Sequence, residues 1–509
     1  MPVQLGWQRK MPAEPATTGG DGPRSSQRIA FGTVARSAGE VLAKLASLAF
    51  FIAIARELGE GQFGDFIYGL SLSTVLLTGA GLGMQELIAR EVASDHVRVD
   101  ALLWNVVVLK GLMLLVLLGV ITAIVAIQGF PFETGLSILI VSVGIGFEYQ
   151  ANSFFAVLQG YERQHLIATS LIVNRVATAA LGIGVLLAGG GLVAVAIVFT
   201  VGSALGLGTA FLLMQRYVVR PEHDVDRAAW PSLIRASLPL GVFTVLATVS
   251  LRSSVVLLGF LGASSVTVGQ YGASFRLIEA LLFISSAFSA ALLPWFSRHR
   301  GSGPVPLSRG FEMSLKAVIA ATLPLALALA LFAEPVITTL YGAEYDGAVT
   351  PLRILAAMTV LVGINGVITA VLIGRNRPRE YTVPAVLAIA LTLILSFFLI
   401  PPYGAVGAAI TAVAGAAGLA GLTVAATTRL VGSIAPLRVA VAPLAAGAAM
   451  ALVAVLLAGA PWVPVAVASA VAYGAAFLGI ERVFFPGDFA WYAGILSARP
   501  RLQERPSQA

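Results

Sequence analysis

The sequence predicts an all-α polytopic membrane protein, and three observations carry that prediction. Of its 509 residues, 58% are hydrophobic and 11% are charged, and the mean hydropathy is +0.90, whereas soluble chains are about half apolar and a quarter charged. Apolar stretches of about twenty residues, each long enough to cross about 30 Å of hydrocarbon, recur along most of the chain. Arginine and lysine collect in every second connection between these stretches, as membrane topology requires.

These stretches predict about fourteen transmembrane helices. Their expected ranges are 31–57, 66–89, 101–127, 135–159, 165–189, 191–215, 233–260, 266–296, 310–333, 350–374, 381–401, 404–428, 437–459 and 463–485. Only Arg56 and Arg353 lie near the face opposite the basic connections. The alternation of basic and non-basic connections therefore predicts a protein of the cytoplasmic (inner) membrane with both termini in the cytoplasm. An odd number of spans would be incompatible with this alternation.

An internal repeat appears when the first half is shifted by about 205 residues. Gly64-Asp65-Phe66 then meets Gly269-Gln270-Tyr271, and Lys110 falls within a residue of Lys316. Six spans per half give the two halves the same orientation, so we expect two pseudo-symmetric lobes related by an axis along the membrane normal. The expected organisation is a disordered cytoplasmic tail at 1–28, an N-lobe at 29–217, a cytoplasmic linker at 218–232, a C-lobe at 233–430, two further helices at 431–485 and a cytoplasmic tail at 486–509.

Charged side chains inside the expected spans are the candidate substrate-binding residues, because each costs a few kcal/mol to insert and therefore tends to face the bundle interior. The basic candidates are Arg36, Lys44, Lys110, Arg175, Arg252, Arg276 and Lys316, and the acidic ones are Glu40, Glu148 and Glu279. The surplus of base indicates an anionic cargo. Arginine suits phosphate in particular, because its planar fork donates two hydrogen bonds at once.

Depth along each helix ranks these candidates. Arg175, Glu148, Arg276 and Glu279 lie nearest the expected midplane, and Arg252 lies at a depth similar to that of Arg276 on the preceding helix. Two interpretations stand for Glu148 and Arg175, which either bind cargo or pair with each other to hold neighbouring helices together. Arg252 and Arg276 are the strongest candidates for the anion.

The remaining candidates have two interpretations each. Arg36, Glu40 and Lys44 follow at spacings of four and share one helical face, which either lines a cavity or reaches the cytoplasmic water boundary. Lys110 and Lys316 lie near cytoplasmic helix ends, where a lysine can snorkel to water, but their matching repeat positions favour a shared role.

No enzymatic signature is present. The chain has no cysteine and four dispersed histidines, which predicts neither a metal site nor a catalytic triad. Its four lysines leave no GxxxxGK[ST] nucleotide loop, so we expect no cofactor, and an ion gradient or the membrane potential remains as the driving force. Glu148 and Glu279 are the hypothetical proton-coupling residues. The basic residues form no soluble face with interleaved aromatics, which argues against nucleic acid.

Two stretches, 31–95 and 335–356, carry a family resemblance. The motifs within 31–95 are Ala53-Ile54-Ala55-Arg56-Glu57-Leu58-Gly59, Gly61-Gln62-Phe63-Gly64-Asp65-Phe66, Gly81-Leu82-Gly83 and Arg90-Glu91-Val92-Ala93. The motifs within 335–356 are Leu340-Tyr341-Gly342-Ala343-Glu344-Tyr345, Ala348 and Leu352-Arg353-Ile354-Leu355. Together with fourteen spans in two six-helix lobes, these stretches resemble the Wzx-type polysaccharide flippases of the multidrug/oligosaccharidyl-lipid/polysaccharide (MOP) superfamily.

The resemblance implies a flippase that moves an undecaprenyl-diphosphate-linked oligosaccharide from the inner to the outer leaflet by alternating access, for surface polysaccharide biosynthesis. It implies membrane lipids, a polysaccharide polymerase and glycosyltransferases as partners. In the related lipid II flippases the last two spans shape a groove for the isoprenoid tail, and the nearly uncharged spans at 437–459 and 463–485 suit that role.

Three alternatives remain open at this point. A lipid II flippase would share the fold and the basic site. A drug/cation antiporter would need carboxylates to dominate its interior, and the surplus of arginine points away from that. A membrane glycosyltransferase or polymerase would need a large external loop, whereas the longest expected one, at 334–349, spans only about sixteen residues.

Overall fold

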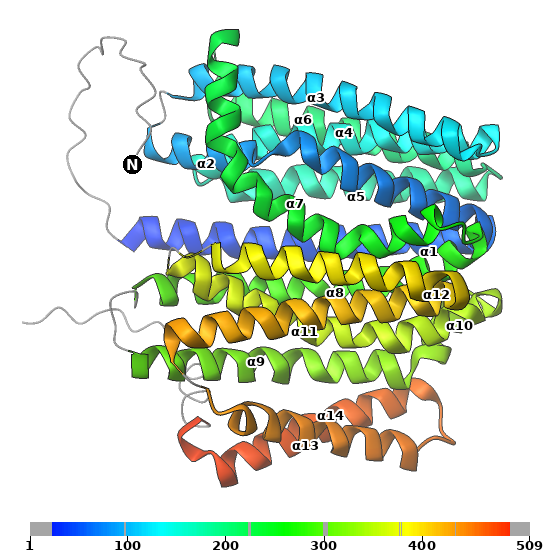
Figure 1. The fold of residues 1–509 in the computed structure, drawn as a ribbon, viewed down its shortest axis with the longest axis vertical. Coiled ribbons are helices and arrows are strands. Elements are labelled where there is room, and N and C mark those ends of the chain that lie inside the picture. The colour runs from blue at the N-terminus through cyan, green and yellow to red at the C-terminus, as the bar shows by residue number, and fades with distance from the viewer. Residues whose placement is uncertain are drawn as a thin grey trace, which may run out of the picture. The chain divides into compact units, whose positions relative to one another are not determined.

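The computed structural model describes residues 23–95, 98–221, 225–298, 304–375, 377, 379–432 and 434–488. Within these ranges every regular element is helical (Figure 1). The elements are α1 (Pro23–Gly81), α2 (Met84–Ser94), α3 (Arg98–Gln128), α4 (Phe132–Gly160), α5 (Gln164–Leu187), α6 (Leu192–Tyr217), η1 (Arg227–Ala229), α7 (Trp230–Phe260), α8 (Ser265–Arg298), α9 (Pro304–Leu331), α10 (Ala333–Leu340), η2 (Ala343–Ala348), α11 (Val349–Gly374), α12 (Arg379–Val431), α13 (Pro436–Leu456) and α14 (Trp462–Phe484).

Helix α1 is a helical hairpin rather than a straight rod. At Gly59 the backbone takes φ 72° and ψ 172°, which favours glycine because it has no Cβ. Across this break the rings of Phe50 and Phe66 lie with their centroids 6.3 Å apart. In a straight helix the two residues would be about 24 Å apart at 1.5 Å per residue. The two arms of α1 therefore run back along each other.

Helix α12 folds back in the same way at Gly404, where φ is 51° and ψ is −124°. A methyl group added to Gly415 would lie 2.0 Å from Oγ1 of Thr392, so the two arms pack closely at a position where glycine leaves room. In a straight helix these residues would be about 35 Å apart. At full length α12 would be more than twice the thickness of the hydrocarbon core, and the break resolves this mismatch.

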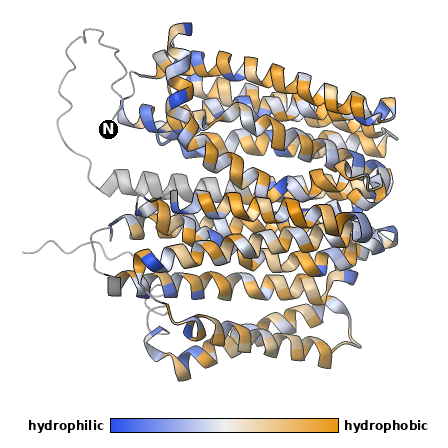
Figure 2. Cartoon of the chain, in the orientation of Figure 1, coloured by the Kyte–Doolittle hydropathy of each residue, from blue (hydrophilic) through white to orange (hydrophobic). Residues whose placement is uncertain are grey.

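Within the described ranges, ten helices are long and apolar enough to cross a membrane, or eleven if the two bent segments of α7 count as one span. This number counts α12 once and does not include α1. It is therefore lower than the fourteen spans expected from the sequence, which stays a prediction. Apolar residues cover most of the length of these helices, and polar residues gather towards their ends (Figure 2).

The chain divides into two compact units. Unit 1 comprises residues 1–276 and 395–408, and unit 2 comprises residues 277–394 and 409–509. The first boundary lies inside α8 and not at the predicted linker 218–232, because α7 packs against α1 and α2. The linker region itself holds η1, and Trp230 next to it donates a hydrogen bond from Nε1 to Oδ1 of Asn105 on α3 (3.1 Å). The division into lobes at 29–217 and 233–430 stays a prediction.

In unit 1, the closest packing joins α4 to α6 and α1 to α5. An aromatic cluster lies where α1 meets α6. Phe66 contacts Phe50, Phe51 and Phe199, with ring centroids 6.0–6.3 Å apart. These rings are at most 4% exposed, so they form a core between the two arms of the α1 hairpin and α6.

Unit 1 also contains a glycine contact between α1 and the start of α8. A methyl group on Gly64 would lie 1.8 Å from the carbonyl oxygen of Ser265, and one on Gly269 would lie 2.0 Å from the carbonyl oxygen of Glu60. Gly64 and Gly269 are the positions that the predicted repeat superimposes. The same shift also exchanges Glu60 with Ser265, so the two contacts are reciprocal, as expected for segments that meet across a two-fold axis.

Helix α7 bends by 50° between its segments Arg227–Val242 and Thr244–Phe260. The bend follows Pro239, which cannot donate a backbone hydrogen bond to the preceding turn. Next to the bend, Gly241 touches the break between α1 and α2, where a methyl group on Gly83 would lie 2.3 Å from the nitrogen of Gly241. In unit 1, the bend of α7 thus lies against the break between α1 and α2.

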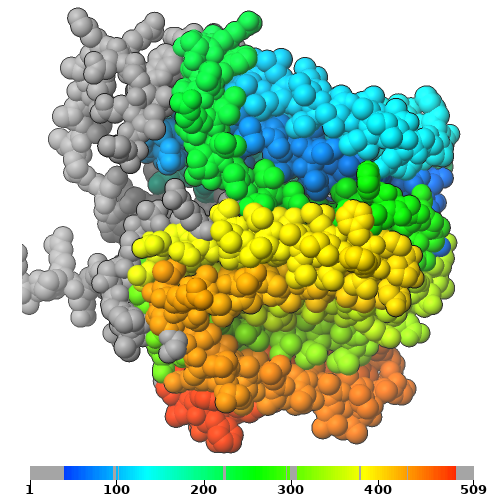
Figure 3. All heavy atoms as spheres, in the orientation of Figure 1, coloured from blue at the N-terminus to red at the C-terminus, as the bar shows by residue number. Residues whose placement is uncertain are grey.

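In unit 2, α9 packs against α11, α13 and α14, and α13 and α14 form a pair. The space-filling view shows side chains filling the spaces between the ribbons of this pair (Figure 3). Buried residues of the pair include Ala446, Met450 and Tyr473, and Tyr473 donates a hydrogen bond to the carbonyl oxygen of Ala320 on α9 (3.0 Å). The predicted additional helices at 431–485 therefore pack against the helices that precede them.

Candidate functional site

The two strongest candidates, Arg252 and Arg276, lie in unit 1 on α7 and on the first half of α8. Arg252 follows the bend of α7 and is half-buried, and its Cζ lies 5.7 Å from the ring centroid of Phe275. Arg276 is 9% exposed, and its Cζ lies 3.7 Å above the ring of Phe51 on α1. Each guanidinium is therefore held over an aromatic face, which stabilises a cation where water is scarce.

The ring below Arg252 is itself fixed. Phe275 is buried and stacks on Tyr271 one turn earlier in α8, with centroids 6.0 Å apart and planes 11° apart. Phe51 belongs to the aromatic cluster of α1 and α6. Neither ring was predicted from the sequence, where charge alone marked the candidates. Phe275 precedes Arg276 directly, but the contact of Phe51 with Arg276 becomes visible only once the packing of the helices is known.

Glu148 on α4 and Arg175 on α5 form an ion pair, with 2.8 Å between Oε1 and Nη1. Glu148 also accepts hydrogen bonds from Asn174 (3.5 Å) and from Ser203 on α6 (3.3 Å). This carboxylate thus joins three helices of unit 1. Of the two interpretations that the sequence left open, the geometry favours pairing between the helices.

Lys110 on α3 is buried to 1% exposure and does not snorkel to water. Its Nζ donates to the backbone carbonyl oxygen of Tyr149 and to Oγ of Ser153 on α4 (3.4 Å). Its position follows from the packing of α3 along α4, which buries this face of both helices.

Tyr149 connects four helices of unit 1. Its backbone meets Lys110, while its hydroxyl contacts the hydroxyl of Thr78 on α1 and donates to the carbonyl oxygen of Thr74 (3.3 Å). Thr78 in turn lies 3.5 Å from Oγ1 of Thr248, which is one turn before Arg252 on α7. Tyr149 was not predicted from the sequence, because a tyrosine is uncharged at neutral pH and charge alone marked the candidates.

Lys316 lies in unit 2, on α9, and is also 1% exposed. Its Nζ is 2.6 Å from Oε1 of Glu481 on α14 and 3.1 Å from Oδ2 of Asp488 just beyond that helix. Asp488 also accepts from Arg309 (2.8 Å) and from Arg438 on α13 (2.9 Å). We call these five side chains the carboxylate clamp.

Asp488 is the centre of the carboxylate clamp. It is fully buried although it falls in the segment 486–509 expected to be a tail. Burial alone would raise the pKa of its carboxyl, but the hydrogen bonds and charges of Arg438 and Lys316 outweigh burial and hold the pKa below its usual range. Asp488 therefore stays ionised at physiological pH. In the sequence, the signal for this buried position was an acid that directly follows the last apolar stretch, at the start of a largely basic tail.

The structure separates the remaining candidates. Lys44 is half-buried on α1 and Glu279 is half-buried in the part of α8 that belongs to unit 2. The side chains of Arg36 and Glu40 lie outside the described residues, although their backbone belongs to α1. Unit 1 thus holds Arg252, Arg276, the Glu148–Arg175 pair and Lys110. Among the described residues, no group of three or more acids or histidines is placed to hold a metal ion.

Comparisons with known proteins show the family of the chain. Residues 30–299 match the family described as polysaccharide biosynthesis protein. The probable low-salt glycan biosynthesis flippase Agl15 of Haloferax volcanii is 23% identical over 366 residues, covering 70% of this chain and 74% of Agl15. An uncharacterized membrane protein of Methanocaldococcus jannaschii, MJ1068, is 28% identical over 137 residues, 27% of each chain.

Solved structures show the fold. The lipid II flippase MurJ, in an inward closed conformation, superimposes with a TM-score of 0.74 at 15% identity, over 88% of this chain and 99% of MurJ. An inward-facing multidrug resistance MATE transporter of the MOP superfamily gives a TM-score of 0.61 at 15% identity, over 77% of this chain and 94% of the transporter. Fold and spans define a multi-pass membrane protein with the fold that MurJ and this MATE transporter share. The chain belongs to the polysaccharide biosynthesis protein family.

Proposed function

We propose that this protein is a flippase that moves an undecaprenyl-diphosphate-linked oligosaccharide from the inner to the outer leaflet of the cytoplasmic membrane by alternating access, for surface polysaccharide biosynthesis. The family, the name of the Agl15 relative and the MOP fold support a glycan flippase. Polymerases and glycosyltransferases are the enzymes that would consume and supply such a cargo. The basic connections support cytoplasmic termini.

The observation that carries the proposal is the pair of arginines on α7 and α8 of unit 1. A lipid-linked oligosaccharide has one strongly charged part, its diphosphate, and that part must leave water to cross. A guanidinium can donate two parallel hydrogen bonds to a phosphate. The rings of Phe275 and Phe51 support the guanidinium groups of Arg252 and Arg276 and so hold them in place for a phosphate.

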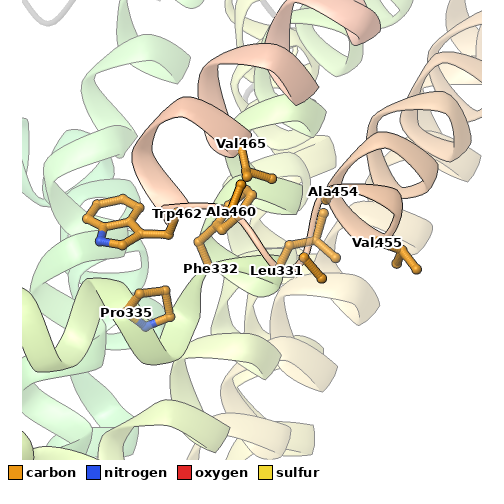
Figure 4. Close-up of a pocket in the computed structure, with 9 residues that line it drawn as sticks. Leu331, Phe332, Pro335, Ala454, Val455, Ala460, Trp462 and Val465 are labelled. Atoms are coloured by element: carbon orange, nitrogen blue, oxygen red, sulfur yellow. The ribbon is translucent and has the colours of Figure 1, made fainter.

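A second observation concerns the lipid tail. In unit 2 a pocket of about 340 Å³ opens between the end of α9, the start of α10 and the facing ends of α13 and α14. Its lining includes Leu331, Phe332, Pro335, Val455, Trp462 and Val465. In Figure 4, Leu331, Phe332 and Val465 lie close together, Trp462 and Pro335 lie on one side of them, and Val455 stands apart on the other side. We assign to it a segment of the isoprenoid chain, for which apolar contact is favourable.

Lipid II is the second candidate cargo, and the superposition on MurJ favours it. Both cargoes carry a diphosphate on an isoprenoid, so the arginines serve either one. Complementation separates them. We expect the gene to restore surface polysaccharide to cells that lack their polysaccharide flippase and to leave cells depleted of their lipid II flippase unable to grow. The reverse result would replace the first cargo by the second.

Removing charge from Arg252 or Arg276 tests the site. We expect Arg252→Gln and Arg276→Gln to reduce flipping of a lipid-linked oligosaccharide in proteoliposomes by at least about tenfold each, since a hydrogen bond to a charged group contributes about 1.5–3 kcal/mol. Arg252→Lys and Arg276→Lys keep the positive charge but lose the planar guanidinium group that donates two hydrogen bonds, so they should retain part of the flipping activity.

Arg216→Gln is the matched control, because Arg216 also lies over an aromatic ring, that of Tyr217, but is exposed at the end of α6. Its flipping rate should equal that of the wild type. Protein abundance and melting temperature are measured for every variant, so that loss of the folded protein is distinguished from loss of flipping. Normal rates in both glutamine variants would refute the assignment of the arginines.

A further inference from the structure

Lys110 and Lys316 occupy matching positions in the predicted repeat, and both are buried to 1% exposure in the interior of their units. Their surroundings differ. Lys316 faces two carboxylates, those of Glu481 and Asp488, at 2.6 and 3.1 Å. The Nζ of Lys316 therefore has two anionic partners within the carboxylate clamp.

Lys110 has neutral partners. Among the described residues no carboxylate lies within 4.0 Å of its Nζ, and its two hydrogen-bond acceptors are the carbonyl oxygen of Tyr149 and the hydroxyl of Ser153. An ammonium has three N–H donors, whereas a neutral amine has two. Two acceptors in a buried site therefore match the neutral amine, and burial without a counter-ion disfavours the charged form.

Four helices, α1, α2, α4 and α7, pack against α3 and bring their charged groups towards Lys110. On α2, Glu86 favours the ammonium from beyond ion-pair distance, but it is exposed and accepts a hydrogen bond from Thr244 (3.2 Å). On α4, Glu148 is engaged by Arg175. On α7, Arg252 lies over the ring of Phe275. On α1, the contact with Tyr149 is through the uncharged Thr78.

We propose that Lys110 is a proton-binding site that couples proton movement to the transport cycle. Its Nζ takes up one proton from water on one side of the membrane to become an ammonium, and releases that proton to water on the other side when the site opens there. The inference deepens the proposed function, on which its transport consequence rests. It assigns the coupling to a lysine and leaves Glu148 and Arg175 as a pair that joins helices.

The contacts of Tyr149 provide the link to the arginines. Protonation changes the hydrogen bonding of Nζ to the carbonyl oxygen of Tyr149, whose hydroxyl meets Thr78. Thr78 lies 3.5 Å from Thr248, one turn from Arg252 on the same segment of α7. A change at Lys110 thus reaches the segment of α7 that carries Arg252 through contacts within unit 1.

Proton binding can be measured directly, without cargo, because the chain has only four lysines: Lys10, Lys44, Lys110 and Lys316. The purified full chain, labelled with lysine carrying ¹³C at Cε, is titrated by NMR in lipid nanodiscs. Lys110→Arg and Lys316→Arg assign the two buried resonances. We expect the Lys110 resonance to move from its charged to its neutral position at a lower pH than that of an ordinary lysine.

Glu86→Gln provides a quantitative check in the same experiment. Removing the carboxylate that favours the ammonium should move the Lys110 titration to lower pH and leave the Lys316 resonance in place. A Lys110 resonance that stays at its charged position up to about pH 9, close to the behaviour of an ordinary lysine, would overturn the proposal. That result needs no transport assay and no variant other than those used for assignment.

Coupling is then tested by flipping in proteoliposomes with and without an imposed pH gradient. We expect the gradient to accelerate the wild type severalfold and to have no effect on Lys110→Met. Lys316→Arg, which keeps the cation of the carboxylate clamp, should still respond to the gradient. If the wild type flips cargo equally fast with and without the gradient, coupling at Lys110 is refuted while the proposed function stands. If no lipid-linked oligosaccharide is flipped, the proposed function fails and the NMR titration still decides proton binding.

Discussion

Asp488 accepts from three cations at once, which is unusual for an acid that follows the last membrane helix. Arg309 and Lys316 approach from α9 and Arg438 from α13, and all three distances are 3.1 Å or less. The aromatic ring of Phe485 covers Lys316, with 3.9 Å between its centroid and Nζ. This single carboxylate thus joins α9 and α13 to the segment that follows α14. Its negative charge compensates the positive charges of the three cations, which would otherwise repel one another.

Asp488→Asn should lower the stability of unit 2. Removing one member of a buried charge cluster costs about 3–5 kcal/mol, since the remaining cations lose their partner. The measurement is the apparent melting temperature in detergent, and Arg482→Gln is the control because Arg482 is exposed one residue after Glu481. Equal melting temperatures for Asp488→Asn and the wild type would show that the clamp does not hold α14 in place.

At the scale of elements, glycines decide how helices approach and turn. Gly59 and Gly404 turn α1 and α12 back on themselves with positive φ angles. Gly64 and Gly269 instead allow the backbones of α1 and α8 to touch. Close contact between small residues replaces the hydrophobic effect inside a membrane, where lipid is as apolar as the helices.

Gly64→Ala should disrupt the contact between α1 and α8, because the added methyl group would lie 1.8 Å from the carbonyl oxygen of Ser265 and backbone cannot easily yield. We expect a loss of about 1–3 kcal/mol in stability, as for overpacked cores. Gly61→Ala is the matched control on the same arm, since its nearest neighbour, Val266, is 4.0 Å away. Thermal unfolding of both variants measures the difference, and a destabilised Gly61→Ala would contradict the explanation.

At the scale of the whole molecule, the number of crossings sets which residues face which side. The described helices give ten or eleven candidates, and the hairpin at Gly404 shows that one long helix contains two antiparallel arms. If both arms of α12 cross, its tip and its C-terminal end must lie on opposite sides of the membrane. The exposed Tyr403 is at the tip and the exposed Arg429 is near the end.

The absence of cysteine makes this topology directly measurable. We expect Tyr403→Cys to react with a membrane-impermeant thiol reagent in intact cells, and Arg429→Cys to react only after the membrane is permeabilised. Labelling of both positions, or of neither, in intact cells would be incompatible with fourteen crossings and with α12 as two of them.

Much of the fold follows from the sequence, because bilayer thickness and loop charge constrain helices strongly. The location of Arg252 and Arg276 inside spans followed from the same constraint. What Lys110 and Lys316 contact did not, since helix depth says nothing about which neighbour a side chain faces. Lys110 met neutral oxygens on α4, and Lys316 met the carboxylates of Glu481 on α14 and of Asp488 in a segment expected to be a tail. Partners that are distant in sequence need the packing to be known.

The reciprocal contact of Gly64 and Gly269 has a consequence for the origin of the chain. Residues that pack against their own repeat counterpart near a two-fold axis would, in a protein made of one repeat, pack against the same residue of a second copy. A half-length ancestor with six crossings would thus already have had a self-complementary surface at this glycine. Gene fusion would then have joined two subunits of a homodimer, and the linker at 218–232 would mark the junction.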